Sequence, residues 1–141
     1  MRNELARLYG QSQMASAPSG RQVEVTVLRA ASGKIRACLG TEGPVTWSQR
    51  LGEALRFNLK IWDVFIADWS APECQLPLEL RQNLLSLGAF IRAKSFGQMA
   101  NPERATLETL LNINENLAAG VAQGPASTSS APESVEAGQA V

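Results

Sequence analysis

Six side chains in the middle of the chain recur at alternating spacings of four and three residues, and five of them are large and apolar. They are Leu51, Leu55, Asn58, Trp62, Phe65 and Trp69. Because an α-helix turns once in about 3.6 residues, this spacing puts all six on one side of a helix, in the seam pattern of packed helices. A second apolar flank consists of Ala54, Phe57, Ile61 and Val64. The pattern predicts a central helix that begins at Thr46, ends before Pro72 and is buried on a wide face.

The preceding segment, residues 21–39, combines two patterns. Its "VEVTVL" stretch alternates apolar and polar residues as a β-strand does. A helical spacing nevertheless runs through Val25, Leu28, Ala31, Ile35 and Cys38. No second strand pattern lies nearby, and a lone strand has no neighbour for its backbone hydrogen bonds. We therefore predict a helix over residues 21–39, bent or frayed around Gly33.

A third helix is predicted from Pro77 onward, because proline suits a first helical turn, where a missing amide proton costs nothing. Its inner face is expected to consist of Leu80, Leu84, Leu87 and Ile91, broadened by Leu85 and Phe90. Gly88 allows a neighbouring helix to approach closely. The fourth helix is expected to have Asn101 as its cap and Pro102 at its first position. Its seam is Leu107, Leu110, Asn114, Leu117 and Val121.

These segments predict an all-α fold, a small antiparallel helical bundle of about four main helices plus a short N-terminal helix over residues 4–9. We expect residues 1–20 to be an N-terminal arm and residues 21–122 to be the bundle domain. Residues 123–141 contain no Leu, Ile, Phe or Trp. They bury too little to offset the entropy of ordering, so we expect a disordered C-terminal tail.

The residue types argue against an enzyme. The chain has no histidine, which removes histidine-based triads, histidine-ligated zinc and imidazole proton shuttles. Cys38 and Cys74 stand apart without CxxC spacing, and Cys74 lacks the flanking cations that would activate a thiol. No glycine-rich phosphate loop is present. We therefore expect no catalytic residues, no metal site and no cofactor.

The charge balance bears on the class of partner. With 13 basic and 13 acidic side chains the formal net charge is zero, whereas proteins that bind phosphate backbones usually carry a positive surplus. Arg29, Lys34 and Arg36 form a local basic stripe, which we interpret as a solvated helix face. The sequence has neither an apolar stretch of about 18 residues nor an apolar N-terminal signal region. We therefore expect a cytoplasmic protein with no membrane contact and no direct nucleic-acid binding.

Two asparagines, Asn58 and Asn114, occupy seam positions on different helices. A buried amide without a partner costs about 1–3 kcal/mol, so each amide needs one. One interpretation is that they bond each other or a backbone carbonyl and fix the helix register. In the other, they line a groove and bond the main chain of an inserted peptide. Trp62 is open to the same two interpretations, as a core residue or an anchor, while Trp47, beside the helix cap, is expected to be partly exposed.

Three stretches of the chain follow one another in a recognisable order. They are "NLKIW" at residues 58–62, "QLPLELRQNLLSLGAFI" at 75–91 and "LLNINENLAAG" at 110–120. Together they resemble the FlaF family of flagellar biosynthesis regulators over about residues 9–122. That family is similar in an Asn-x-x-x-Trp pair on a central helix, here Asn58 and Trp62. It is also similar in an "LP-x-x-LR" helix start, here ending at Arg81, and in a late "IN", here ending at Asn114.

The resemblance implies a small cytoplasmic helical protein needed for flagellin production, acting with or against the FlbT regulator of flagellin messenger RNA. We expect a chaperone that binds a terminal helical segment of flagellin by a helix-in-groove mode and supports its synthesis and export. The candidate partner-binding residues are Asn58, Trp62, Arg81, Asn114 and Trp47. The alternative is a regulator of flagellin mRNA translation, acting directly or through FlbT. Exposed apolar surface could equally form a homodimer.

Overall fold

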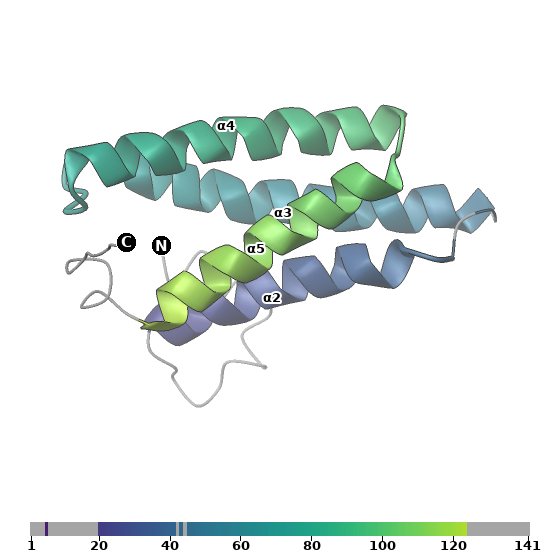
Figure 1. The fold of residues 1–141 in the computed structure, drawn as a ribbon, viewed down its shortest axis with the longest axis horizontal. Helices are drawn as coiled ribbons and strands as arrows, with labels where there is room; N and C mark the ends of the chain where they lie inside the picture. Colours follow the sequence, from purple (N-terminus) through teal and green to yellow (C-terminus); the bar gives the residue numbers. More distant parts are fainter. Residues whose placement is uncertain (1–4, 6–19, 42, 44, 124–141) are drawn as a thin grey trace.

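The computed structural model describes residues 5, 20–41, 43 and 45–123 of the 141-residue chain. Within these residues the fold is all-α and the four main helices pack antiparallel, as predicted (Figure 1). They are α2 (Gly20–Cys38), α3 (Val45–Ser70), α4 (Leu78–Ala100) and α5 (Arg104–Gln123). The predicted short N-terminal helix, most of the N-terminal arm and most of the C-terminal tail lie outside the described residues.

The helices are not equally enclosed. α3 lies between α2 and α4, and α5 crosses obliquely over α2 (Figure 1). α4 packs mainly against α3 and has only a minor contact with α5. One long side of α4 is therefore left without a neighbouring helix among the described residues.

The central seam is confirmed as the core of the bundle. All six seam residues of α3 are at most 6% exposed, and Trp62, Leu55 and Asn58 have no exposed surface. Val27, Leu28, Ala31 and Ile35 of α2 and Leu107 and Leu110 of α5 meet this seam, and Leu5 is buried in the same cluster. Each large side chain buried in this way contributes about 1.5–3 kcal/mol through its removal from water.

The ambiguous first segment is a helix, as predicted, but the fraying expected around Gly33 is wrong, because α2 continues through this residue without interruption. Its last turn is capped from outside the helix. The indole Nε1 of Trp47 donates a hydrogen bond to the Cys38 carbonyl oxygen at 2.7 Å, and the Thr41 hydroxyl donates to the same oxygen at 3.1 Å. Carbonyls at a helix end lack intrahelical partners, so these donors stabilise the end of α2. Gly40 follows with a φ of 82°, a left-handed conformation that glycine adopts without strain.

The predicted start of the last helix was wrong. α5 begins at Arg104, so Asn101 and Pro102 belong to the turn that precedes it. The Asn101 amide instead closes the end of α4, donating to the Gly97 carbonyl oxygen at 2.9 Å. The buried Gln98 side chain supplies the acceptor at the entry to α5, because its Oε1 receives the Glu103 amide proton at 2.6 Å. A side chain from the preceding helix has replaced the local cap.

Gly88 lets α3 and α4 approach closely, as predicted. A Cβ atom at this position would lie 2.7 Å from Ile66 Cγ1 and 2.8 Å from Ile66 Cδ1. Real Cβ atoms do not approach carbon that closely, so any larger residue would force the two helices or the Ile66 side chain to move. The glycine thus brings α4 close to α3 beside Ile66 and Trp62.

Candidate partner-binding site

The two seam asparagines bond each other, which confirms the first interpretation of their pattern. Asn114 Nδ2 donates to Asn58 Oδ1 at 2.7 Å, and Trp62 Nε1 donates to Asn114 Oδ1 at 2.8 Å. Asn58 Nδ2 is 3.4 Å from the Ser95 hydroxyl, which accepts from it. All four residues have no exposed surface. We call this set the amide network; it joins α3, α4 and α5 at one level of the bundle.

Three of the five predicted partner-binding residues belong to the amide network. Asn58, Trp62 and Asn114 are enclosed and already bonded, so a partner cannot touch them in this arrangement of the helices. The Trp62 ring also packs against aromatic neighbours, with centroids 6.3 Å from Phe65 and 6.0 Å from Trp69. These contacts and hydrogen bonds fix the register of three helices.

The other two predicted residues lie at opposite ends of the bundle. Trp47 is half-buried near the start of α3, as expected, and its indole caps α2. Arg81 is half-buried in the first turn of α4, and its guanidinium forms no ion pair within the part of the chain that the structure describes. Because α3 and α4 are antiparallel, their first turns are separated by the length of the bundle (Figure 1). The five residues therefore do not form one surface.

A surface that the sequence pattern did not identify lies on α4. Leu78 is 59% exposed, Phe96 53% and Phe90 40%. Phe90 was predicted to broaden the inner face, and this was wrong. Small exposed residues lie around the two phenylalanines, whereas exposed Gln82 and Ser86 separate Leu78 from them on the same side of the helix. We define the outer face of α4 as its exposed apolar and small residues, Leu78, Ala89, Phe90, Ala93, Phe96 and Gly97. The sequence did carry a sign of this surface, because α4 has apolar residues on all of its sides. Such a pattern is typical of a helix that is covered all round.

Two cations border the outer face of α4. The Arg92 guanidinium lies 5.5 Å from the Phe96 ring centroid, and Lys94 Nζ lies 5.7 Å from that of Phe90. Arg92 also pairs with Asp63 of α3. Such cation–π contacts at exposed sites contribute about 0.5–1 kcal/mol, which helps to hold each ring against the helix. Each of the two exposed rings therefore has a cation of α4 beside it.

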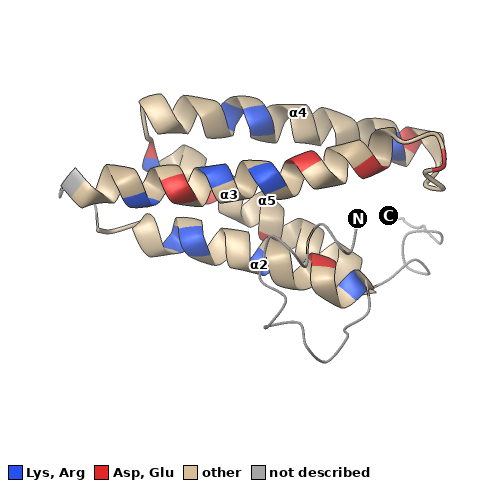
Figure 2. Cartoon of the chain, turned by 180° about the vertical axis from the view of Figure 1, so that it is seen from behind, with Lys and Arg blue, Asp and Glu red and all other residues tan. Residues whose placement is uncertain are grey.

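The predicted basic stripe on α2 is partly neutralised. Arg29 and Arg36 lie 3.1 Å and 3.8 Å from the Glu115 carboxylate of α5. Lys34 turns instead toward α3, where its Nζ lies 4.9 Å from the centroid of the Phe57 ring. Figure 2 shows basic bands on neighbouring halves of α2 and α3, with an acidic band among those of α3, while the other half of α3 carries acidic bands. Four cations that form no ion pair among the described residues therefore lie along these two helices: Lys34, Arg50, Arg56 and Lys60.

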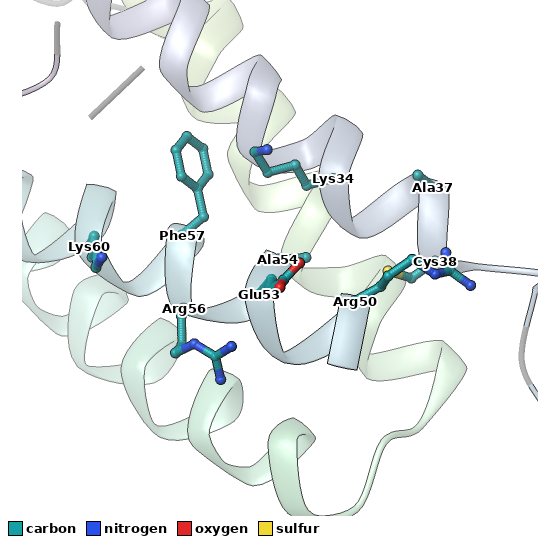
Figure 3. A pocket seen from close by; sticks show the side chains of 9 residues that line it. All are labelled: Lys34, Ala37, Cys38, Arg50, Glu53, Ala54, Arg56, Phe57 and Lys60. Atoms are coloured by element: carbon teal, nitrogen blue, oxygen red, sulfur yellow. The ribbon is translucent and has the colours of Figure 1, made fainter. Parts of the chain in front are cut away.

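A hollow of about 450 Å³ occupies this place (Figure 3). We call it the basic hollow, and it is lined by Lys34, Ala37, Cys38, Arg50, Glu53, Ala54, Arg56, Phe57 and Lys60. Four of these side chains are cations and one is a carboxylate. The lining comes from α2 and α3 alone, so the basic hollow and the outer face of α4 are separate surfaces.

None of the helices in the described part of the chain combines the length and the apolar composition that a membrane span requires. No three side chains of the His, Cys, Asp or Glu types gather in the described part of the chain as a metal site would require.

Comparison with known proteins identifies the family of the chain. A family model described as "Flagellar protein FlaF" matches residues 6–121, which is most of the chain and all of the main helical bundle up to the last turn of α5. The resemblance found from the order of three motifs is thereby confirmed. The comparison found no match among the curated proteins and none among the solved structures.

Proposed function

The chain belongs to the FlaF family of flagellar proteins, and from this premise we propose that it is a non-enzymatic regulator that binds flagellin. It acts as a chaperone that supports the synthesis and export of flagellin. The observation that carries the proposal is the outer face of α4, an apolar helix surface without a neighbouring helix among the described residues.

The outer face suits an amphipathic helix as its guest. The helical spacing puts Leu78, Ala89, Ala93 and Phe96 on one side of α4, with Phe90 on the flank. Small residues let a second helix axis come close, while the two aromatic rings provide large apolar contacts at either side. Covering these side chains would stabilise the complex by about 25 cal/mol per Å² of apolar surface removed from water. A terminal segment of flagellin is the guest that we propose.

The predicted partner-binding residues divide into two roles in this proposal. Arg81 lies one turn after Leu78, and its guanidinium is available to a carboxylate of the bound segment. Asn58, Trp62 and Asn114 act indirectly, because the amide network holds α4 against α3 and keeps the outer face in position. Trp47 stabilises the far end of the bundle and has no contact with the guest.

The test is a calorimetric titration of the full chain with flagellin and with its isolated N-terminal and C-terminal segments. We expect one terminal segment to bind, and the double variant Phe90→Glu, Phe96→Glu to lose at least about tenfold in affinity, because two apolar contacts become charged. Ala119→Glu with Ala122→Glu is the matched control, since it places two carboxylates on exposed positions of α5. No binding of flagellin or either segment would refute the proposal, and so would equal losses in the variant and its control.

A further inference from the structure

We propose that the basic hollow between α2 and α3 binds a segment of a partner protein in which carboxylate side chains flank one large apolar side chain. This inference concerns a different surface from the outer face of α4. It rests on residues of α2 and α3 only, and it holds or fails independently of whether flagellin binds to α4.

The floor of the basic hollow is apolar. Ala54 and Cys38, with only 3% and 2% of their surface exposed, line the hollow together with the half-buried Phe57 (Figure 3). A volume of about 450 Å³ lies within the range of about 300–1,000 Å³ that is usual for ligand pockets. A hollow of this size accepts a few side chains, not a folded domain. An apolar side chain of the partner would be the natural occupant of its floor.

The rim is positively charged, and its cations have no acidic partner among the described residues; Arg50 donates only to the Thr41 hydroxyl at 3.5 Å, and Lys34 lies over the Phe57 ring. Lys34, Arg50, Arg56 and Lys60 are all exposed, and Glu53 is the one carboxylate in the lining. Among the described residues none of these four cations has an acidic group within 4.0 Å. By contrast, the four ion pairs found among those residues use Arg29, Arg36, Arg92 and Arg104. A surplus of positive charge in one place on a chain of zero net charge is complementary to carboxylates of a partner.

The same features favour a protein segment over a nucleic acid. Proteins that hold single-stranded nucleic acid usually combine a basic groove with several aromatic rings on which bases stack. The lining has a single ring, Phe57, and the Lys34 ammonium already lies 4.9 Å from its centroid. A protein segment with alternating acidic and apolar side chains would in contrast contact both parts of the hollow, the carboxylates at the rim and the apolar side chain at the floor.

The test uses the full chain and a fluorescein-labelled peptide of repeated Glu-Leu-Glu-Ala units, with binding followed by fluorescence anisotropy. We expect saturable binding that weakens as salt is raised from about 50 to about 300 mM, because exposed charges are screened. Replacing each Glu of the peptide by Lys should abolish binding. Replacing each Leu by Ser should weaken it, because the apolar floor would then lose its contact.

The double variant Arg56→Glu, Lys60→Glu should weaken peptide binding at least about tenfold, since it reverses two rim charges at exposed positions. The matched control is Arg21→Glu, Arg104→Glu, which makes the same change in net charge at exposed positions outside the hollow and away from the outer face of α4. Equal losses in both variants would overturn the proposal, because they would show an effect of net charge alone.

Two competitors complete the test. An oligouridylate of about 12 nucleotides that displaces the peptide and binds more tightly would reassign the hollow to nucleic acid and overturn the proposal. The second is the chain's own segment 124–141, which carries Glu133 and Glu136 and no cation. Peptide binding that emerges only after this segment is deleted would assign the hollow to the chain itself. Unchanged binding after the deletion, together with weak oligouridylate binding, supports a partner protein.

Discussion

Two neighbouring residues of α4, Ser95 and Phe96, show how differently the two sides of this helix are built. The polar Ser95 has no exposed surface and lies in the amide network, whereas the apolar Phe96 is 53% exposed on the outer face. On the inner side, buried polar groups are stabilising because each finds a partner. On the outer side, apolar surface stays in contact with water and contributes little to folding. The inner side thus serves the fold, and the outer side remains available for binding.

The largest expected difference between the two sides of α4 is the change in the free energy of unfolding when an aromatic ring is removed from each side. Trp62→Ala should lower the free energy of unfolding by about 3–5 kcal/mol, because it leaves a large cavity and removes the donor to Asn114. Phe96→Ala should change it by less than about 1 kcal/mol, since the ring is half exposed. Urea denaturation measures both values. Similar losses from the two substitutions would mean that α4 is packed on both sides.

The amide network itself is tested by a pair of asparagines on α5. Asn114→Ala leaves the Trp62 indole N–H without its acceptor and the Asn58 Oδ1 without its donor, and should cost about 1–3 kcal/mol. Asn112→Ala is the matched control at an exposed position on the same helix, and should cost less than about 0.5 kcal/mol. Thermal and urea unfolding of the two variants give the difference. An Asn114 variant as stable as the Asn112 variant would show that the network is not needed for the fold.

Two glycines of α4 make a third comparison between its sides. Gly88→Ala should destabilise the bundle by about 1–3 kcal/mol, because the new Cβ would meet Ile66 at 2.7 Å. Gly97→Ala should stabilise it by up to about 1 kcal/mol, since a Cβ there meets nothing within 4 Å and alanine is the better helix former. Circular dichroism melting curves should move in opposite directions. A shift of the same sign in both variants would contradict the close approach of α3 and α4.

The smallest expected effect concerns the outer face alone. Phe90→Ser with Phe96→Ser should leave the unfolding free energy within about 1 kcal/mol of the original, yet reduce the binding of an apolar dye such as anilinonaphthalene sulfonate. Light scattering of the same samples tests the homodimer considered from the sequence. A mass that falls from dimer to monomer in the variant would show that a second copy covers the outer face. A fall in stability of several kcal/mol would refute its description as exposed.

Helix existence and the central seam were predictable because they depend on local spacing. The spacing from Leu51 to Trp69 placed every seam residue correctly in the core, and Gly88 was recognised as a point of close approach. The start of α5 was not predictable from its own residues, because its acceptor is the Gln98 side chain of the preceding helix. Phe90 was misplaced because α4 is apolar on several sides, so that spacing alone does not decide which side faces the core.

The sequence by itself determined the family, the all-α class, the approximate extents of the helices and the asparagines that had to find partners. The tertiary structure decided which partners those were, which side of α4 faces α3 and where the free cations gather. The physical reason is the range of the interactions involved. Helical periodicity and turn signals act between residues a few positions apart, whereas Asn58 meets Asn114 and Lys34 meets Phe57 only after separate helices have packed.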